Sequence, residues 1–227
     1  MLENENTPAV SNIITSYNYA AYITRAIRSC LAQKFCDVEI IVVDDASTDD
    51  TISVIDTWMY NITLIRNETN MGVAASRNVG LKAARAPFVI MLDADDYITK
   101  YACFILKEYC ESNNELLATA CVYIKVDENE NVIGRCSAKD EPISCGVMYR
   151  TDLLRALNGY NNNIRHREEE EMRRRIGERY VVDYLRMPLY RYCIHGKNKT
   201  LSEEYKHFDL AITTEALKIL AKEYENK

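Results

Sequence analysis

The sequence contains no apolar run long enough to cross a lipid bilayer, which takes about 20 residues. Its first residues, Met1–Glu5, are polar and acidic, whereas a secretory signal begins with a basic segment followed by an apolar core. Neither a signal peptide nor a membrane span is therefore expected. We expect a cytoplasmic protein, and peripheral contact with a membrane face stays open.

Paired cysteines and a basic surface are also missing. None of the eight cysteines forms a Cys-x-x-Cys pair, and most lie within apolar segments, which is typical of reduced, buried thiols in the cytosol. The formal net charge is −6, whereas a general nucleic-acid binder usually has a basic face. No nucleic-acid partner is therefore expected. Nucleotides stay compatible, because a metal ion and backbone amides can hold their phosphates.

The two common glycine-rich phosphate loops are absent as well. Ser16–Tyr19 follow the first apolar segment in place of Gly-x-Gly-x-x-Gly, and Gly-x-x-x-x-Gly-Lys occurs nowhere. These absences disfavour a dinucleotide-binding Rossmann domain and a P-loop. Diphosphate binding would then depend on a metal ion held by acidic side chains.

The first half of the chain alternates apolar strands with helical segments. Strands are expected at Val10–Thr15, Glu39–Val43, Ile62–Ile65 and Phe88–Leu92. Helices are expected at Ala20–Lys34, from the Ala46–Asp49 cap region to about Met59, and at Val73–Ala84. This alternation predicts an α/β fold with a Rossmann-like, mostly parallel central sheet and helices on both faces.

Polar clusters follow three of these strands. They are Thr15–Asn18, Asp44–Asp45 and Asp93–Asp96. Ligands of open α/β sheets bind outside the carboxyl ends of the strands, so the three clusters together favour a site. Three aspartates within four positions repel one another unless a cation lies between them, and Mg²⁺ or Mn²⁺ prefers such oxygens. Any one cluster alone is equally typical of a turn or a helix N-cap.

The second half is less regular and predicts a smaller mixed region. Helices are expected at Lys100–Cys110, Thr151–Leu157, Glu168–Ile176 and Leu201–Tyr224. Strands are expected at Leu117–Val126, Ser144–Tyr149, Val181–Val182 and Leu189–Cys193, with a hairpin turn at Asn129–Asn131.

Four motifs in order carry a resemblance. They are Ile13–Asn18, Val42–Asp49, Asn70–Asn78 and Leu92–Asp96. Together they resemble the inverting family 2 glycosyltransferases of the GT-A fold, which carry an Asp-x-Asp motif. The match is close over Val10–Tyr97. A looser match continues through Gly146–Arg150, Asn158–Tyr160, Leu189–Tyr192 and His195.

The resemblance implies one GT-A domain over residues 1–227. Residues 7–97 would form its nucleotide-sugar-binding half, residues 98–200 its acceptor-side half and residues 201–227 a C-terminal helix. It also implies a divalent metal, Mn²⁺ or Mg²⁺. Asp95 would be the first ligand, Asp93 would bind the metal through water or contact the ribose, and Asp96 would support them. His195 would complete the metal shell, although a lone loop histidine beside a glycine is more often structural or solvated.

The donor nucleotide would contact the ends of the strands. The implied residues are Thr15, Ser16, Tyr17, Asn18, Asp44, Asp45, Arg77, Asp93 and Ala94. Tyr17 would stack on the base, Asp45 would accept the uracil imide N–H, and Asp44 would lie near the ribose. Arg77 would face the diphosphate or the neighbouring acids, and an ordinary helix-surface arginine is the alternative.

Inverting transfer needs a general base for the acceptor hydroxyl. Family members usually have Glu-Asp where this sequence has Glu168-Glu169, so Glu169 is the candidate base, with Glu168 behind it. Glu169 stands at the usual Asp position, and its side chain is one methylene longer. A structural alternative exists, because Glu169–Glu171 precede Arg173–Arg175 by four residues, a spacing that stabilises an exposed helix.

These features together predict a metal-dependent, inverting transfer of a sugar from a nucleotide-diphosphate donor, most simply a UDP-sugar, to a hydroxyl of a glycan or another acceptor. Polysaccharide or glycoconjugate synthesis would use such a step, and a homodimer stays open. Two alternatives remain. A glycosyltransferase-like module could bind nucleotide sugar without turnover, because the Glu-Glu pair is non-standard. A sugar-1-phosphate nucleotidyltransferase would need a glycine-rich basic loop that is missing here.

Overall fold

The computed structural model describes residues 7–141, 143–164, 168–177, 180–196 and 198. The chain divides into two compact units, Met1–Cys193 and Ile194–Lys227. In the second unit, the description covers residues 194–196 and 198, so the helix expected at Leu201–Tyr224 lies outside the described residues. Within the described ranges, none of the helices is long and apolar enough to cross a membrane.

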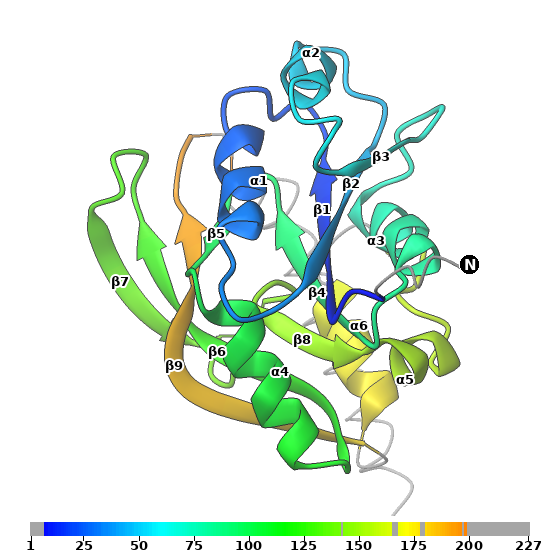
Figure 1. Cartoon of the computed structure of the whole chain (residues 1–227), viewed down its shortest axis with the longest axis vertical. Helices are drawn as coiled ribbons and strands as arrows, with labels where there is room; N and C mark the ends of the chain where they lie inside the picture. The colour runs from blue at the N-terminus through cyan, green and yellow to red at the C-terminus, as the bar shows by residue number, and fades with distance from the viewer. Residues whose placement is uncertain (1–6, 142, 165–167, 178–179, 197, 199–227) are drawn as a thin grey trace, which may run out of the picture. The chain divides into compact units, whose positions relative to one another are not determined.

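Four parallel strands form the first half of the sheet, in the spatial order β3-β2-β1-β4 (Figure 1). They are β1 (Val10–Ser16), β2 (Val38–Asp44), β3 (Thr63–Arg66) and β4 (Phe88–Asp93). Their apolar runs are buried on both faces, apart from β3 at the edge, where the side chains are partly exposed. The parallel half predicted from strand–helix alternation is confirmed.

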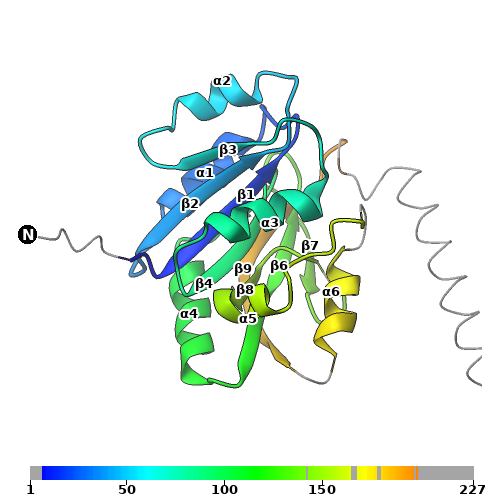
Figure 2. The ribbon, with the colours of Figure 1, turned by 90° about the vertical axis from the view of Figure 1, so that its right-hand side faces the viewer.

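Helices cover both faces of these strands. They are α1 (Ile23–Leu31), α2 (Thr51–Asp56) and α3 (Val73–Ala83). Figure 2 shows α3 in front of the strands and α1 behind them. The placement follows from right-handed crossovers, because the chain moves outward from β1 to β3 and then returns to β4. Gly80 lets α3 pack closely, since a Cβ there would meet the Ile13 side chain.

The second half continues the sheet with mixed strand directions. Its strands are β5 (Tyr97–Ile98), β6 (Leu116–Val126), β7 (Val132–Ser137), β8 (Val147–Arg150) and β9 (Val181–Cys193). Its helices are α4 (Ala102–Ser112), α5 (Thr151–Ala156) and α6 (Glu168–Ile176). Strand β8 pairs antiparallel with both β4 and β6, and β9 runs parallel to β6. The β6–β7 hairpin at Asn129–Asn131 and the helix at α6 are confirmed.

The strand β5 was not predicted, and two predicted strands differ in extent. β9 is one strand of 13 residues, where two short strands were expected around Pro188. A proline donates no ladder hydrogen bond, and β9 tolerates it because its register with β6 shifts at Val122, the partner of Pro188. β8 begins at Val147 rather than at Ser144. Ser144 is therefore a loop residue.

Candidate active site

The carboxyl ends of β1, β2 and β4 meet at one edge of the sheet. In the ladder, Ser16 is the Cα partner of Asp44, and Thr15 is the partner of Asp93. The predicted meeting of the three polar clusters is therefore confirmed. Ligands of open α/β sheets bind at such an edge, so the following polar contacts define the candidate site.

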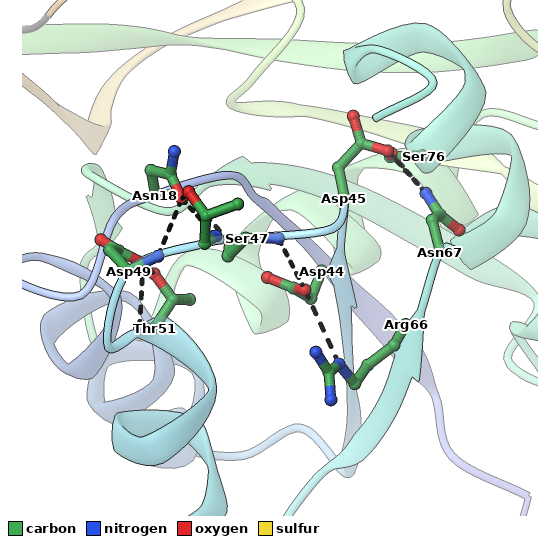
Figure 3. A network of polar contacts seen from close by, with 10 residues as sticks. Asn18, Asp44, Asp45, Ser47, Asp49, Thr51, Arg66, Asn67 and Ser76 are labelled. Atoms are coloured by element: carbon green, nitrogen blue, oxygen red, sulfur yellow. Dashed lines mark hydrogen bonds and ion pairs between the residues drawn. The ribbon is translucent and has the colours of Figure 1, made fainter. Parts of the chain in front are cut away.

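Asn18 joins the loop after β1 to the loop after β2 (Figure 3). Its backbone N–H donates to Ser47 Oγ at 2.9 Å. Its side-chain oxygen accepts from the backbone N–H groups of Thr48 at 2.8 Å and Asp49 at 3.3 Å. Asn18 has a φ of 60°, a left-handed conformation that asparagine tolerates better than most residues. The two loops are thereby held as one wall of the site.

Asp45 holds the loop that precedes α3, and Figure 3 shows it together with Asn67 and Ser76. Its Oδ1 accepts from Asn67 Nδ2 at 2.8 Å and from the backbone N–H of Met71 at 2.9 Å. Its Oδ2 accepts from the N–H of Gly72 at 2.8 Å. Asn67 Nδ2 also contacts Ser76 Oγ at 3.0 Å. Asp45 thus has a structural role that the sequence did not reveal, and among the contacts of the described residues one acceptor position on Oδ2 is left for a ligand.

Two buried oxygens at the same edge have no hydrogen-bond partner in the part of the chain that the structure describes. They are Asp44 Oδ1 and Ser16 Oγ. Asp44 Oδ2, in contrast, accepts from the backbone N–H of Ser47 at 3.1 Å and lies 3.9 Å from Arg66 Nε. Buried polar atoms are normally paired, so a polar ligand at this edge would satisfy them.

The Asp93–Asp96 turn holds its three carboxylates in different surroundings. The Asp93 side chain is 35% exposed, whereas Asp95 and Asp96 are buried. Asp96 accepts from Tyr190 Oη at 2.5 Å and from the N–H of Cys193 at 2.8 Å, so it fastens the turn to β9. Burial, followed by the charges of Asp95 and Asp93, raises the pKa of Asp96 well above its usual value.

The mutual repulsion of these three aspartates bears on the predicted metal site. No group of three or more His, Cys, Asp or Glu side chains within the described ranges is arranged to hold a metal ion. The donor set at the turn therefore amounts to Asp93 and Asp95, with Asp96 occupied by β9. Two carboxylates fit a hard divalent cation that takes its remaining oxygens from phosphate and water.

Arg77 lies at the centre of the site although it projects from α3. It is 2% exposed and donates to Asp93 Oδ1 at 2.9 Å and to Glu168 Oε1. It also donates to Cys145 Sγ at 3.5 Å, and its guanidinium lies 5.4 Å from the ring centre of Tyr160. Arg77 is therefore buried between the neighbouring acids, and the alternative of a helix-surface arginine is wrong.

The first turn of α6 brings two glutamates to Arg77 and to a serine. Glu168 is buried against Arg77, and Ser144 Oγ lies 3.2 Å from Glu168 Oε1 and 3.2 Å from Glu169 Oε2. Burial, followed by the charge of Glu168, raises the pKa of Glu169 from 4.5 to about 7. A carboxylate with a pKa near neutrality is suited to exchange protons at physiological pH.

Comparison with known proteins agrees with this geometry. Residues 11–180 match the family model described as glycosyl transferase family 2. The chain belongs to glycosyl transferase family 2.

Several relatives of this family are longer than the chain. Chondroitin synthase from Escherichia coli is 26% identical over 88% of the chain and 31% of the relative. Hyaluronan synthase from Pasteurella multocida is 28% identical over 86% of the chain and 21% of the relative. An uncharacterized glycosyltransferase from Haemophilus influenzae is 38% identical over 41% of the chain and 38% of its own length. The chain thus spans about a fifth to two fifths of these relatives.

Solved structures of GT-A glycosyltransferases share the fold. S. aureus TarS 1-349 in complex with UDP-GlcNAc has a TM-score of 0.73 at 24% identity, over 86% of the chain and 61% of TarS 1-349. The mannosyltransferase PcManGT from Pyrobaculum calidifontis, in complex with GDP-Man and Mn²⁺, has a TM-score of 0.69 at 19% identity. That match covers 86% of the chain and 59% of PcManGT. The predicted GT-A fold is confirmed.

In this chain the turn after α5 joins α3 to α6 through the side chains of Asn78 and Arg175. Asn78 Nδ2 donates to the carbonyl of Tyr160 at 2.7 Å, and its side-chain oxygen accepts from the N–H of Tyr160 at 2.8 Å. Arg175 pairs with Glu171 at 2.7 Å and also donates to the carbonyl of Gly159 at 2.6 Å. The predicted helix pairing thus forms for Glu171, where it anchors α6 to the turn after α5.

Ser144 was missed, and the expected strand at Ser144–Tyr149 was the reason. Gly146, two residues after Ser144, was the sequence signal of a loop, and in the structure its φ is 69°. Among the other predicted donor residues, Thr15 and Ala94 are buried at the site edge and Tyr17 is half-buried.

His195 lies in the second unit, where its backbone N–H donates to Asn198 Oδ1 at 2.5 Å. Its metal role, the single-domain organisation, the homodimer and the cytoplasmic location stay predictions.

Proposed function

We propose that this chain carries out the metal-dependent, inverting transfer of a sugar from a nucleotide-diphosphate donor to an acceptor hydroxyl, with a UDP-sugar as donor. Glu169 is the proposed general base, and the edge formed by β1, β2 and β4 is the proposed donor site. A glycan acceptor, as in polysaccharide or glycoconjugate synthesis, suits the names of the chondroitin and hyaluronan synthases among the relatives.

The Arg77 network is the observation that carries the proposal. It joins Asp93, at the end of the donor-side strand β4, to Glu168, beside the proposed base. Groups that act on the two partners of a transfer reaction must lie close together, and this buried guanidinium brings them to one place. Asp93 is thereby held at the donor edge by a charged partner.

The donor nucleotide is assigned to the unsatisfied edge of the sheet. Asp44 Oδ1 and Ser16 Oγ are buried without a partner in the described ranges, and ribose or base groups would supply hydrogen bonds there. Tyr17 is proposed to stack on the base and Asp45 Oδ2 to accept its imide N–H. A uridine donor is supported by the UDP-GlcNAc complex of TarS, although that likeness by itself concerns the fold.

Asp95 and Asp93 are the residues proposed to hold Mn²⁺ or Mg²⁺. Their charges help to raise the pKa of Asp96, so a cation would relieve an existing repulsion. When bound, such an ion stabilises the negative charge that develops on the leaving diphosphate. The mannosyltransferase structure with the same fold contains Mn²⁺.

Glu169 is proposed to remove the proton of the acceptor hydroxyl. The acceptor O–H bond breaks and its proton moves to the carboxylate, while the acceptor oxygen bonds to the anomeric carbon. The bond between that carbon and the diphosphate oxygen breaks, and its electron pair leaves with the diphosphate. Attack from the opposite side inverts the configuration. A base with a pKa of about 7 is ionised often enough at neutral pH for this role.

A donor panel tests the proposal. UDP-, GDP- and dTDP-sugars are added with and without Mn²⁺, and the melting temperature and the release of nucleotide diphosphate are measured. UDP-sugars with Mn²⁺ are expected to raise the melting temperature most, and UDP is expected to be released when acceptor glycans are present. If no nucleotide raises the melting temperature under either condition, the donor-site assignment is wrong.

A further inference from the structure

Ser144 occupies an unusual position for a side chain with a single donor proton. It is 6% exposed, and its hydroxyl oxygen lies 3.2 Å from a carboxylate oxygen of Glu168 and 3.2 Å from one of Glu169. The loop that holds Ser144 precedes β8, and the two glutamates begin α6. The hydroxyl therefore links this loop to α6, because Glu168 and Glu169 follow Ser144 by 24 and 25 residues in the sequence.

The donor count decides where the proton of Ser144 goes. Ionised carboxylates offer only lone pairs, so one hydroxyl proton cannot serve both of them fully. Glu168 Oε1 already accepts from the guanidinium of Arg77, a charged donor. Within the described ranges, Ser144 is the side-chain donor to Glu169. The proton therefore stabilises Glu169 more than Glu168.

We propose that Ser144 is a positioning residue for the general base, with its hydroxyl proton directed to Oε2 of Glu169. Oε2 is thereby held in place, and Oε1 is left to receive the proton of the acceptor hydroxyl. This inference rests on the proposed function for the identity of the base. Ser144 gains and loses no covalent bond in the reaction.

The surroundings of Glu169 set the sign of the effect. Burial and the negative charge of Glu168, on the same helix, both favour the protonated form of Glu169. Arg77, on α3, and the hydroxyl of Ser144 both favour the carboxylate. Removal of the hydroxyl should therefore raise the pKa of Glu169 further and leave less of the base ionised at neutral pH.

Titration of Glu169 without turnover provides the first test. The protein is labelled with ¹³C at the glutamate carboxyl carbons, and the Glu169 resonance is identified by its absence in Glu169→Gln. Ser144→Ala is expected to raise the pKa of Glu169 by about one unit, the size expected for one lost hydrogen bond to a charged group. Ser144→Thr, which keeps the hydroxyl, should titrate like the wild type.

Two further variants serve as a substitute for Ser144→Ala and as a control. Ser144→Cys nearly keeps the size of the side chain but is only a weak hydrogen-bond donor. It replaces Ser144→Ala if that variant does not fold, and it should shift the pKa of Glu169 in the same direction. Ser11→Ala is the matched control, because Ser11 is a buried serine that donates to a carboxylate, Glu39, at 2.6 Å at the amino end of β1. The Glu169 resonance should not move in Ser11→Ala.

The outcomes separate this inference from the proposed function. An unchanged pKa of Glu169 would mean that the Ser144 hydroxyl donates its hydrogen bond to Glu168 instead. A lowered pKa would mean that Ser144 accepts a hydrogen bond from protonated Glu169. Either result overturns the inference. In an active enzyme, the acid limb of the kcat/KM profile should move with the measured pKa, whereas a merely structural role would lower kcat/KM equally at all pH values. If wild type transfers no sugar but the titration shifts as expected, the proposed function fails and the Ser144 contact stands.

Discussion

The proposed donor half, residues 7–97, and the proposed acceptor-side half, residues 98–200, bring polar residues together by different means. In the donor half, the polar residues follow directly where the apolar runs of β1, β2 and β4 end, so adjacent strands carry them to the same edge. In the second half, the polar residues come from a loop, a turn and a helix start. Ser144, Tyr160 and Glu168 meet because each contacts Arg77 or its partner.

The comparison teaches that the two halves meet through α3. Arg77 and Asn78 are consecutive residues of this helix. Arg77 binds Glu168, and Asn78 holds the turn at Tyr160. A helix that belongs to the donor half by sequence thus positions the proposed base. The following predictions either separate the halves or test how they depend on one another.

The largest effect is expected from Glu169→Gln, which removes the base and should leave the donor half intact. Sugar transfer should fall by about 10²–10⁴-fold, the usual contribution of general base catalysis, while the affinity for donor is unchanged. Steady-state kinetics and donor titration measure the two quantities. Glu170→Gln, the next position on α6, is the matched control and should retain transfer. Loss of donor affinity in Glu169→Gln would contradict the division of roles.

Arg77→Met should uncouple the halves and destabilise the protein. The substitution leaves Asp93 and the buried Glu168 without their cation, and breaking a buried ion pair on one side typically costs about 3–5 kcal/mol. Chemical denaturation measures the loss. Arg85→Met is the control, because the Arg85 side chain is 58% exposed in its pair with Glu39 and its loss should cost at most about 1 kcal/mol. Equal losses in the two variants would refute the coupling role.

Activity and stability should respond to pH in opposite directions through Glu169. Below a pH of about 7 the base is protonated, so kcat/KM should fall about tenfold per pH unit. The pKa in the folded state is raised above 4.5, so this residue contributes stability that is present below pH 4.5 and lost as the pH rises through 7.

Melting temperatures between pH 4.5 and 8 measure that second effect. Wild type should lose stability relative to Glu169→Gln as the pH rises through this range. A constant difference between the two proteins would show that the pKa of Glu169 is not raised.

The smallest effect is expected from Asn78→Ala, which removes the hydrogen bonds to the backbone of Tyr160. The loss should be about 1–3 kcal/mol of unfolding free energy, the cost of leaving buried partners unsatisfied. Donor binding should weaken less than transfer, because the turn serves the base side. Asn163→Ala, at an exposed position of the following loop, is the control and should change stability little. A variant as stable as this control would weaken the case for coupling.

Much of the donor half was predictable because its signals are local. An unbroken apolar run ended by aspartates specifies a buried strand and the residues at its end, and right-handed crossovers then collect the ends of β1, β2 and β4. Prediction from the sequence failed where a residue's conformation depends on contacts with residues distant in the sequence. β9 looked like two strands because the register shift beside Pro188 depends on β6. Ser144 looked like a strand residue because its partners on α6 were not visible.

The sequence by itself determined the parallel strands, the polar edge that they form and the glutamate pair at the start of α6. Tertiary structure alone decided that Asp96 serves β9 and that Asp45 holds the loop before α3. It also decided the burial of Arg77 against Glu168, a residue 91 positions away. The reason is physical, since a charged side chain enters the interior only where the fold brings opposite charges to meet it.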